Sequence, residues 1–428
     1  MRVSDSLSDS KLFSKKNILG WIYFMLAGMF FLYEFFLRTS MGALEEIFRL
    51  DLGLSAASIS LISSAYFIAY SLMQVPAGVF LDRYGVRKVG SVAIFVAAMG
   101  SFIFSISSSI FFAWLGRFII GLGSAFAFLM MFKIILDWFP RSRLGFVSGM
   151  TQVLGIIGPI LAGVPLLYLL QAFENDWRKV FFFIMGLGCV LGVLYWLVVR
   201  DKSNIRQFQQ SVVNGNKEKA YYVLLRIIKI KQLWFIALFV FLLYAPIEII
   251  GSLFGIPLIM HQGFSAKVAS AAVSFIWLGL GLGSPIVGYI SDLIGKRKLV
   301  LIFCGVLGAL GVFFLIWGSY SSITMYSFLF LVVGVAAGAQ TLSFTLVIEN
   351  VDEDLSATAV GFNNMFVILG AAFGQLVTGV ILSLIGGDAH SYSLLNYQCA
   401  LTFCVFLFIS SAIVGQLCIK EKFSYIRD

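Results

Sequence analysis

The sequence predicts an all-α, polytopic membrane protein with twelve transmembrane helices in two pseudo-symmetric six-helix bundles. Hydrophobic residues make up 60% of the 428-residue chain and charged residues only 12%, against about 25% in average proteins. Apolar runs of about 20 residues, enough to cross a bilayer, recur along almost the whole chain, and one long basic break divides them six and six. This composition excludes a soluble enzyme, a nucleic-acid-binding module and a disordered chain.

Each apolar run is predicted to be one membrane span. The polar segment 1–16 precedes a run that is too long for a signal-peptide core, so that run is an uncleaved first helix. In chain order the predicted spans are 17–41, 57–81, 88–109, 110–137, 144–170, 178–199, 232–259, 267–291, 298–318, 323–350, 355–384 and 393–420.

The basic residues set the predicted orientation. Most of the 30 lysines and arginines lie in the breaks on one side of the membrane, which the positive-inside rule makes the cytoplasmic side. With both termini cytoplasmic, only four basic residues fall outside: Arg49, Arg178, Lys179 and Lys267. The short chain without a targeting extension leads us to expect a multi-pass protein of a cell inner membrane.

The long break at 200–231 separates an N-terminal bundle, 1–199, from a C-terminal bundle, 232–428. It is rich in lysine and arginine and is predicted to be a cytoplasmic linker near anionic lipid headgroups. Two histidines and five cysteines without a CxxC pair predict no metal site, and we expect no cofactor. The expected partners are a small-molecule substrate and the lipid bilayer, with no nucleic acid, and the expected functional unit is a monomer.

A motif occurs twice at a constant offset of 210 residues. The loop after the second span and the loop after the eighth span share glycine, aspartate, glycine and a basic cluster. Acids that end the fourth and tenth spans match at nearly the same offset. The residues are Gly78, Asp82, Arg83, Gly85, Arg87, Lys88 and Asp137 in the first half and Gly288, Asp292, Gly295, Arg297, Lys298 and Glu349 in the second.

The repeated G-x-x-x-D-x-x-G-x-R-K loop resembles the signature of the major facilitator superfamily. The resemblance covers the whole chain, because both copies fall in the corresponding loops of a 6+6 layout. It implies a transporter with its site between the halves and a cytoplasmic gate formed by these loops. Asp137 and Glu349 are expected partners for Arg87 and Arg297. A role as topology anchors without gating is the alternative.

Five ionisable residues are predicted to lie within the spans, where a charge is costly and indicates function. They are Glu34, Arg38, Arg117, Lys133 and Glu248. The resemblance implies that Arg38 and Arg117 face the substrate cavity, and Lys133 is a third candidate cation nearer the cytoplasm. The alternative for each cation is a structural partner for a nearby acid.

Glu34 and Glu248 are the candidate proton carriers. They lie equally far into the first and seventh spans, so the halves are expected to place one carboxylate each at related depths. A buried carboxylate can exchange protons, which is the chemistry of a symporter driven by a proton gradient. Arg38, one helical turn from Glu34, favours Glu248 slightly as the carrier.

Uncharged polar residues on the predicted inner spans indicate a polar cavity, although each alone is more often an interhelical hydrogen bond. Those assigned to substrate binding are Tyr33, Tyr70, Gln152, Tyr244, Asn363 and Asn364.

The segment from Tyr33 to Arg38 looks like the organic-anion branch of the superfamily, in which an arginine of the first span binds phosphate or carboxylate. Phosphate-ester exchangers carry a second arginine in the seventh span, where this chain has Ile247 and Glu248. The favoured function is therefore proton-coupled import of a carboxylate: a sugar acid, a dicarboxylate or a siderophore-like metal chelate.

Three other functions stay open. A drug or metabolite exporter of the same fold would depend on Glu34 or Glu248 but not on Arg38. An amino-acid or other zwitterion importer would use Glu34 and Arg38 for the two ends of its solute. A membrane enzyme or receptor would need a catalytic or binding constellation in a sizeable loop, and the longest loop is basic with no histidine or cysteine.

Overall fold

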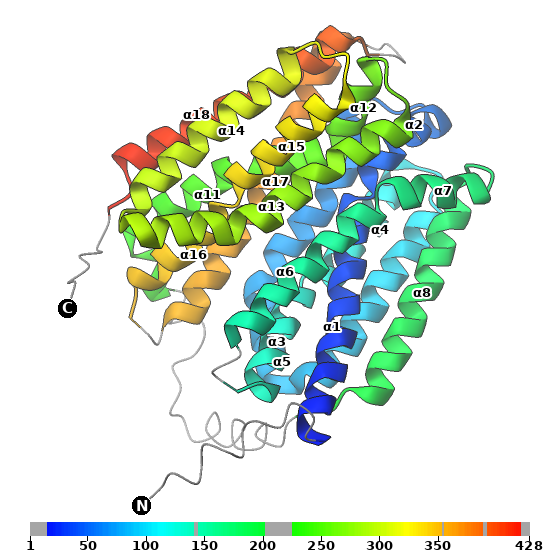
Figure 1. Cartoon of the computed structure of the whole chain (residues 1–428). Coiled ribbons are helices and arrows are strands. Elements are labelled where there is room, and N and C mark those ends of the chain that lie inside the picture. The colour runs from blue at the N-terminus through cyan, green and yellow to red at the C-terminus, as the bar shows by residue number, and fades with distance from the viewer. Residues whose placement is uncertain (1–14, 141–143, 202–224, 353–354, 388–391, 421–428) are drawn as a thin grey trace, which may run out of the picture.

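The computed structural model describes residues 15–140, 144–201, 225–352, 355–387 and 392–420, which form helices and no β-strands (Figure 1). The first half contains α1 (Lys15–Thr39), α2 (Met41–Leu52), α3 (Ala56–Ser105), α4 (Ile110–Ser124), α5 (Ala127–Trp138), α6 (Leu144–Leu161), α7 (Val164–Ala172) and α8 (Trp177–Val198). The second half contains α11 (Lys231–Ile249), the π-helix η2 (Ile250–Phe254), α12 (Gly255–His261), α13 (Ala266–Ile294), α14 (Arg297–Trp317), α15 (Ile323–Ala337), α16 (Gln340–Glu349), α17 (Ser356–Gly386) and α18 (Leu394–Leu417). Most of the predicted linker, 202–224, lies outside the described residues.

In the described part of the chain, eleven helices are long and apolar enough to cross a membrane, and one bent pair brings the number to as many as twelve. The pair joins α6 to α7 at an angle of 43°. Pro159 lies in the last turn of α6, where a proline ring disturbs the helical hydrogen bonds and favours a bend. The predicted all-α, polytopic fold is thus confirmed, with the fifth predicted span broken in two.

The helix α2 was not predicted. Its three carboxylates and one arginine interrupt the apolar pattern, so hydropathy places this segment in a loop. The structure shows an amphipathic helix whose Phe48 ring stacks on Phe104 at 5.4 Å and contacts Trp177 at 4.5 Å. Gly53 ends the helix in the left-handed conformation (φ 61°), which glycine adopts without strain.

The two halves repeat the same local structure 210 residues apart. Ser55 and Ser265 cap α3 and α13 by accepting hydrogen bonds from backbone N–H groups. Gly85 and Gly295, in the repeated loops, both have positive φ values of 81° and 69°. A side chain with a Cβ atom would be strained there, which explains the glycines of the motif.

The offset of 210 residues between the halves corrects the expectation about the depths of Glu34 and Glu248. Because α1 and α11 end 210 positions apart, Arg38 is equivalent to Glu248, and Glu34 is equivalent to Tyr244. The prediction that Glu34 and Glu248 lie at matching depths is therefore wrong. It counted from the start of each span, whereas the repeat aligns the helices at their far ends.

The two halves converge at the end of the molecule that carries α2, α7 and α12, here called the convergent face (Figure 1). They diverge toward the end where α1 begins, the terminal face. Near the convergent face the Ala56 N–H donates to the Tyr392 hydroxyl at 3.0 Å, so α3 of the first half is tied to the segment before α18. A Cβ atom on Gly379 of α17 would lie 2.0 Å from the Ser60 hydroxyl of α3, so glycine permits this close approach.

Candidate functional site

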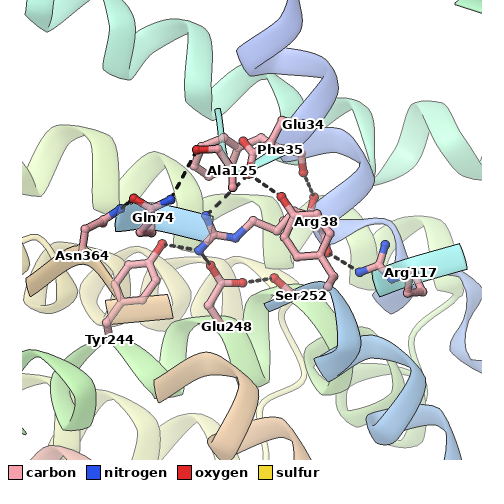
Figure 2. Close-up of polar contacts among 12 residues, drawn as sticks. Glu34, Phe35, Arg38, Gln74, Arg117, Ala125, Tyr244, Glu248, Ser252 and Asn364 are labelled. Atoms are coloured by element: carbon pink, nitrogen blue, oxygen red, sulfur yellow. Dashed lines mark hydrogen bonds and ion pairs between the residues drawn. The ribbon is translucent and has the colours of Figure 1, made fainter. Parts of the chain in front are cut away.

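Arg38 and Glu248 form a buried ion pair between the two halves (Figure 2). Arg38 lies one residue before the end of α1 and Glu248 one residue before the end of α11. Their side chains are only 3% and 0% exposed. The Tyr244 hydroxyl lies 3.3 Å from the Arg38 guanidinium, and the Ser252 hydroxyl of η2 donates to the second Glu248 oxygen. The Arg38 guanidinium thus joins α1 of the first half to α11 of the second half.

Glu34 lies one helical turn before Arg38 and belongs to the same cluster. One of its oxygens is 4.0 Å from the Arg38 guanidinium and accepts a hydrogen bond of 2.5 Å from the Tyr66 hydroxyl. The other oxygen, Oε2, has no hydrogen-bond partner among the described residues. Glu34 therefore keeps two partners within its own half of the chain, whereas Glu248 is paired across the halves.

Aromatic rings surround the Arg38 guanidinium. Its central carbon lies 4.9 Å from the Phe35 ring, 5.4 Å from the Phe67 ring and 5.9 Å from the Tyr244 ring. The rings exclude water and attract the cation through their electron-rich faces. The guanidinium thus lies among three aromatic rings and two carboxylates, those of Glu34 and Glu248.

Arg117 does not share this environment. It is fully buried, and its guanidinium donates to the backbone carbonyls of Leu37 at 2.6 Å and Arg38 at 3.3 Å, the last carbonyls of α1 (Figure 2). The Tyr66 ring lies 5.1 Å away. Carbonyls at a helix C-terminus lack intrahelical partners and carry partial negative charge, which a cation stabilises. Arg117 therefore holds the backbone beneath Arg38, and no acid of the described residues pairs with it.

The other residues assigned to substrate binding are dispersed. Tyr33 donates to the Ile184 carbonyl of α8 at 3.2 Å, and Asn363 donates to Ser343 at 2.7 Å, so each serves packing within its half. Tyr70 lies against the Tyr66 ring at 5.9 Å. Gln152 is exposed on α6, and Lys133 is half-buried on α5.

Asn364 instead joins the halves. Its side-chain amide donates to Gln74 of α3 at 2.7 Å, and Gln74 in turn donates to the Ala125 carbonyl at 3.4 Å (Figure 2).

Ser252 was not predicted as part of the site. Its signal was its place four residues after Glu248, which puts both side chains on one face of the helix.

The two copies of the repeated loop are stabilised differently. In the second half, Arg297 pairs with Glu349 at 2.7 Å and with Asp292 at 3.4 Å, so the expected Arg297–Glu349 contact is present. In the first half, the described residues show no ion pair between Arg87 and Asp137, which was the expected contact. The Arg87 side chain donates to the backbone carbonyl of Trp196 at 2.9 Å, and its guanidinium lies over the indole ring of the same residue. The Asp82 side chain lies outside the described part of the structure.

Within the described residues, no group of three or more His, Cys, Asp or Glu side chains is placed to hold a metal ion. The four buried central charges are two carboxylates, Glu34 and Glu248, and two guanidinium groups, Arg38 and Arg117. Their formal charges cancel, so the site as it stands is neutral.

Comparison with known proteins places the chain among transporters. The model of the Major Facilitator Superfamily matches residues 24–374 and 236–424. A probable hexose phosphate transport protein of Chlamydia muridarum is 24% identical over 92% of each chain. The hexuronate transporter of Bacillus subtilis (strain 168) is 22% identical over 90% of this chain and 92% of its own. The crystal structure of the nucleoside transporter NupG shares the fold with a TM-score of 0.72 at 16% identity, covering 94% of this chain and 100% of that one.

Proposed function

Because the chain belongs to the major facilitator superfamily, we propose that it imports a small organic anion with one carboxylate by proton symport. The solute class that fits best is a sugar acid such as a hexuronate. The observation that carries this proposal is the Arg38–Glu248 pair, which presents one guanidinium to the interface between the halves and already holds a carboxylate on it.

Charge balance supports coupling to a proton. The four buried charges sum to zero, so an added carboxylate would leave one uncompensated negative charge in a low-dielectric environment, which is costly. One proton bound with the solute removes that charge. The arrangement therefore favours one proton for each monoanionic solute.

Glu248 is the proposed proton carrier. Arg38 is the one cation within ion-pair distance of Glu248 among the described residues. When a solute carboxylate takes the place of Glu248 at Arg38, Glu248 loses its cation but keeps the Ser252 hydroxyl, and it binds a proton. When the solute leaves on the other side, Glu248 releases the proton and pairs with Arg38 again. Glu34 remains bonded to Tyr66 throughout.

The balance of buried charges also favours a carboxylate over a phosphate ester as the solute. A doubly charged phosphate would need two compensating charges, and Arg117, the second buried guanidinium, is committed to the α1 carbonyls. Both kinds of sugar derivative appear in the names of the relatives, hexuronate and hexose phosphate. Among the described central residues, Arg38 is the one cation that pairs with carboxylates, which favours the hexuronate type of solute.

For import, we propose that the terminal face is cytoplasmic and that the protein acts as a monomer in a cell inner membrane. The pair that binds the solute is complete within one chain, which supports the monomer. The loops at 78–88 and 288–298 are the proposed gate on the cytoplasmic side, with Arg297 and Glu349 as one contact of that gate.

Uptake into proteoliposomes tests this proposal. Labelled glucuronate is expected to accumulate with an inward proton gradient and to be displaced by other monocarboxylate sugar acids better than by hexose phosphates, amino acids or cationic drugs. Arg38→Gln is expected to abolish uptake, whereas Glu174→Gln, on a side chain that is 88% exposed, is the control. Carboxylate uptake that persists without Arg38, or its absence from the wild type, would refute the proposal.

A further inference from the structure

A cavity of about 390 Å³ opens at the convergent face. Its walls come from both halves: α2 and α7 from the first, and α12, α13 and α18 from the second. Small-molecule sites usually occupy about 300–1,000 Å³. The cavity is separate from the central cluster, because none of Glu34, Arg38, Arg117 and Glu248 lines it.

Two polar side chains of α2, the buried Glu45 and the half-buried Arg49, line the cavity with unused hydrogen-bonding capacity. Glu45 is 1% exposed, and its Oε1 has no hydrogen-bond partner among the described residues. Arg49, one turn along the helix, likewise has its Nε and Nη1 without hydrogen-bond partners. The two groups are 3.8 Å apart, so each neutralises the other's charge although no hydrogen bond joins them. A buried acceptor and two buried donors without partners are expensive.

The chemistry that satisfies this arrangement is a hydroxyl group. When Glu45 is ionised, its charge and that of Arg49 cancel, so the unmet requirement is for hydrogen bonds and not for charge. A hydroxyl donates one hydrogen bond and accepts others, and can therefore serve the carboxylate and the guanidinium together. A charged ligand group would instead break the pairing between them.

The remaining walls fit the apolar faces of a sugar ring. Pro257, Met260 and Leu170 contribute aliphatic surface, and the Tyr397 ring forms part of the wall near His261, at 4.9 Å between ring centres. At the rim, Lys267 of α13 donates to Gln171 of the α7 helix at 3.1 Å and so links the halves. An occupant would thus touch both halves of the chain.

We propose that this cavity is a second binding site, which holds the hydroxyl groups of a sugar-like solute before its carboxylate reaches Arg38. The inference rests on the proposed function only for the identity of the complete solute. The cavity would bind the hydroxyl groups of the sugar ring, and Arg38 would bind the carboxylate.

Saturation-transfer NMR on the purified full-length protein tests the site directly. The probe is galactose, an uncharged hexose that offers Arg38 no carboxylate. Ring-proton signals are expected for the wild type, for Arg38→Gln and for the control Glu174→Gln. They are expected to weaken about tenfold in Glu45→Ala, which loses a hydrogen bond to a charged group, and in Ala43→Phe, which fills the cavity. Glu45→Gln keeps an acceptor and is expected to keep most of the signal, which separates loss of binding from misfolding.

The outcomes of this experiment are distinct from those of the uptake assay. Galactose signals that are absent from the wild type, or unchanged in Ala43→Phe and Glu45→Ala, would overturn the second site and leave only water in the cavity. Galactose signals that depend on Glu45, in a protein that takes up no carboxylate, would support the second site while refuting the proposed function.

Discussion

Arg38 and Glu248 are equivalent residues of the two halves, 210 positions apart, and they pair with each other. Two equivalent groups can touch only near the axis that relates the halves. Any movement of one half relative to the other therefore acts on this contact. In the proposed mechanism, the pair consequently joins three events: separation of the halves, binding of an anion at Arg38 and release of Glu248 to a proton.

Removing one member of the pair should cost more than removing both. Arg38→Gln leaves Glu34 and Glu248 buried without their cation and is expected to lower the free energy of unfolding by about 3–5 kcal/mol. Glu248→Gln should cost less, because Arg38 keeps Glu34 at 4.0 Å. The double variant should recover part of the stability that Arg38→Gln loses, because only Glu34 is then left without the cation, but it should show no transport. Thermal unfolding of the four proteins in detergent measures the cycle.

The exposed pair between Arg178 and Asp51, 2.7 Å apart, is the control for that cycle. Its coupling energy is expected to be about 0–1 kcal/mol, because solvent screens both charges. Equal coupling energies for the buried and the exposed pair would contradict a central role for Arg38 and Glu248.

Arg117 is predicted to act on transport through position and not through contact with the solute. Arg117→Gln removes two hydrogen bonds to the last carbonyls of α1 and should lower stability by about 1–3 kcal/mol. The KM for the solute should rise, because Arg38 is no longer held in place, while the number of protons per solute stays the same. Arg117→Lys should restore part of the affinity. A changed proton ratio would instead make Arg117 part of the proton pathway.

Gly379 should be needed for closure of the convergent face. A Cβ atom there would lie 2.0 Å from the Ser60 hydroxyl and 2.8 Å from the Ala56 carbonyl, so Gly379→Val must push α17 away from α3. Transport should be lost, and the distance between spin labels on α2 and α12 should increase. Gly361→Val is the matched control on the same helix, because an added Cβ atom there meets nothing within 4 Å. A similar loss in both variants would argue against closure as the cause.

Glu45 predicts a pH dependence of stability. Burial raises the pKa of this carboxyl, which lies outside the membrane spans, to about 7, although Arg49 opposes the shift. The folded protein then binds more protons than the unfolded chain between pH 4.5 and about 7, so stability should fall as pH rises through that range. Glu45→Gln should lose this part of the pH dependence and melt higher at neutral pH. Parallel melting curves for the two proteins from pH 5 to 8 would contradict the shift.

The sequence predicted the fold because charge and apolarity are sorted so sharply along it. The spans and their orientation follow from patterns that the bilayer imposes on every helix, and the repeated loops follow from the internal repeat. The helix α2 was not predicted, because an amphipathic helix at the end of a bundle has a mean hydropathy close to that of a loop. The helix breaks at α6–α7 and at η2 likewise leave the mean hydropathy of a span unchanged.

The site was predictable in its members but not in its pairing. Charge within a span singled out Arg38, Glu248 and Arg117 without saying which groups meet. The contact between Arg38 and Glu248 depends on how the two halves pack against each other, which the sequence does not specify. Arg117 was assigned to the cavity because every residue has a backbone carbonyl, so the sequence does not indicate which carbonyls it contacts. The Arg87 side chain shows the same limit, since its partner is the Trp196 carbonyl.

Proton movement during solute uptake, followed with a pH-sensitive dye in proteoliposomes, is the most direct test of the exchange at Arg38. The wild type is expected to carry one proton inward with each sugar-acid molecule. Glu248→Gln is expected to exchange labelled for unlabelled solute across the membrane, because Arg38 remains, but to move no protons and to build up no solute under a proton gradient. Glu248→Gln that still carries one proton per solute would show that Glu248 does not carry the proton.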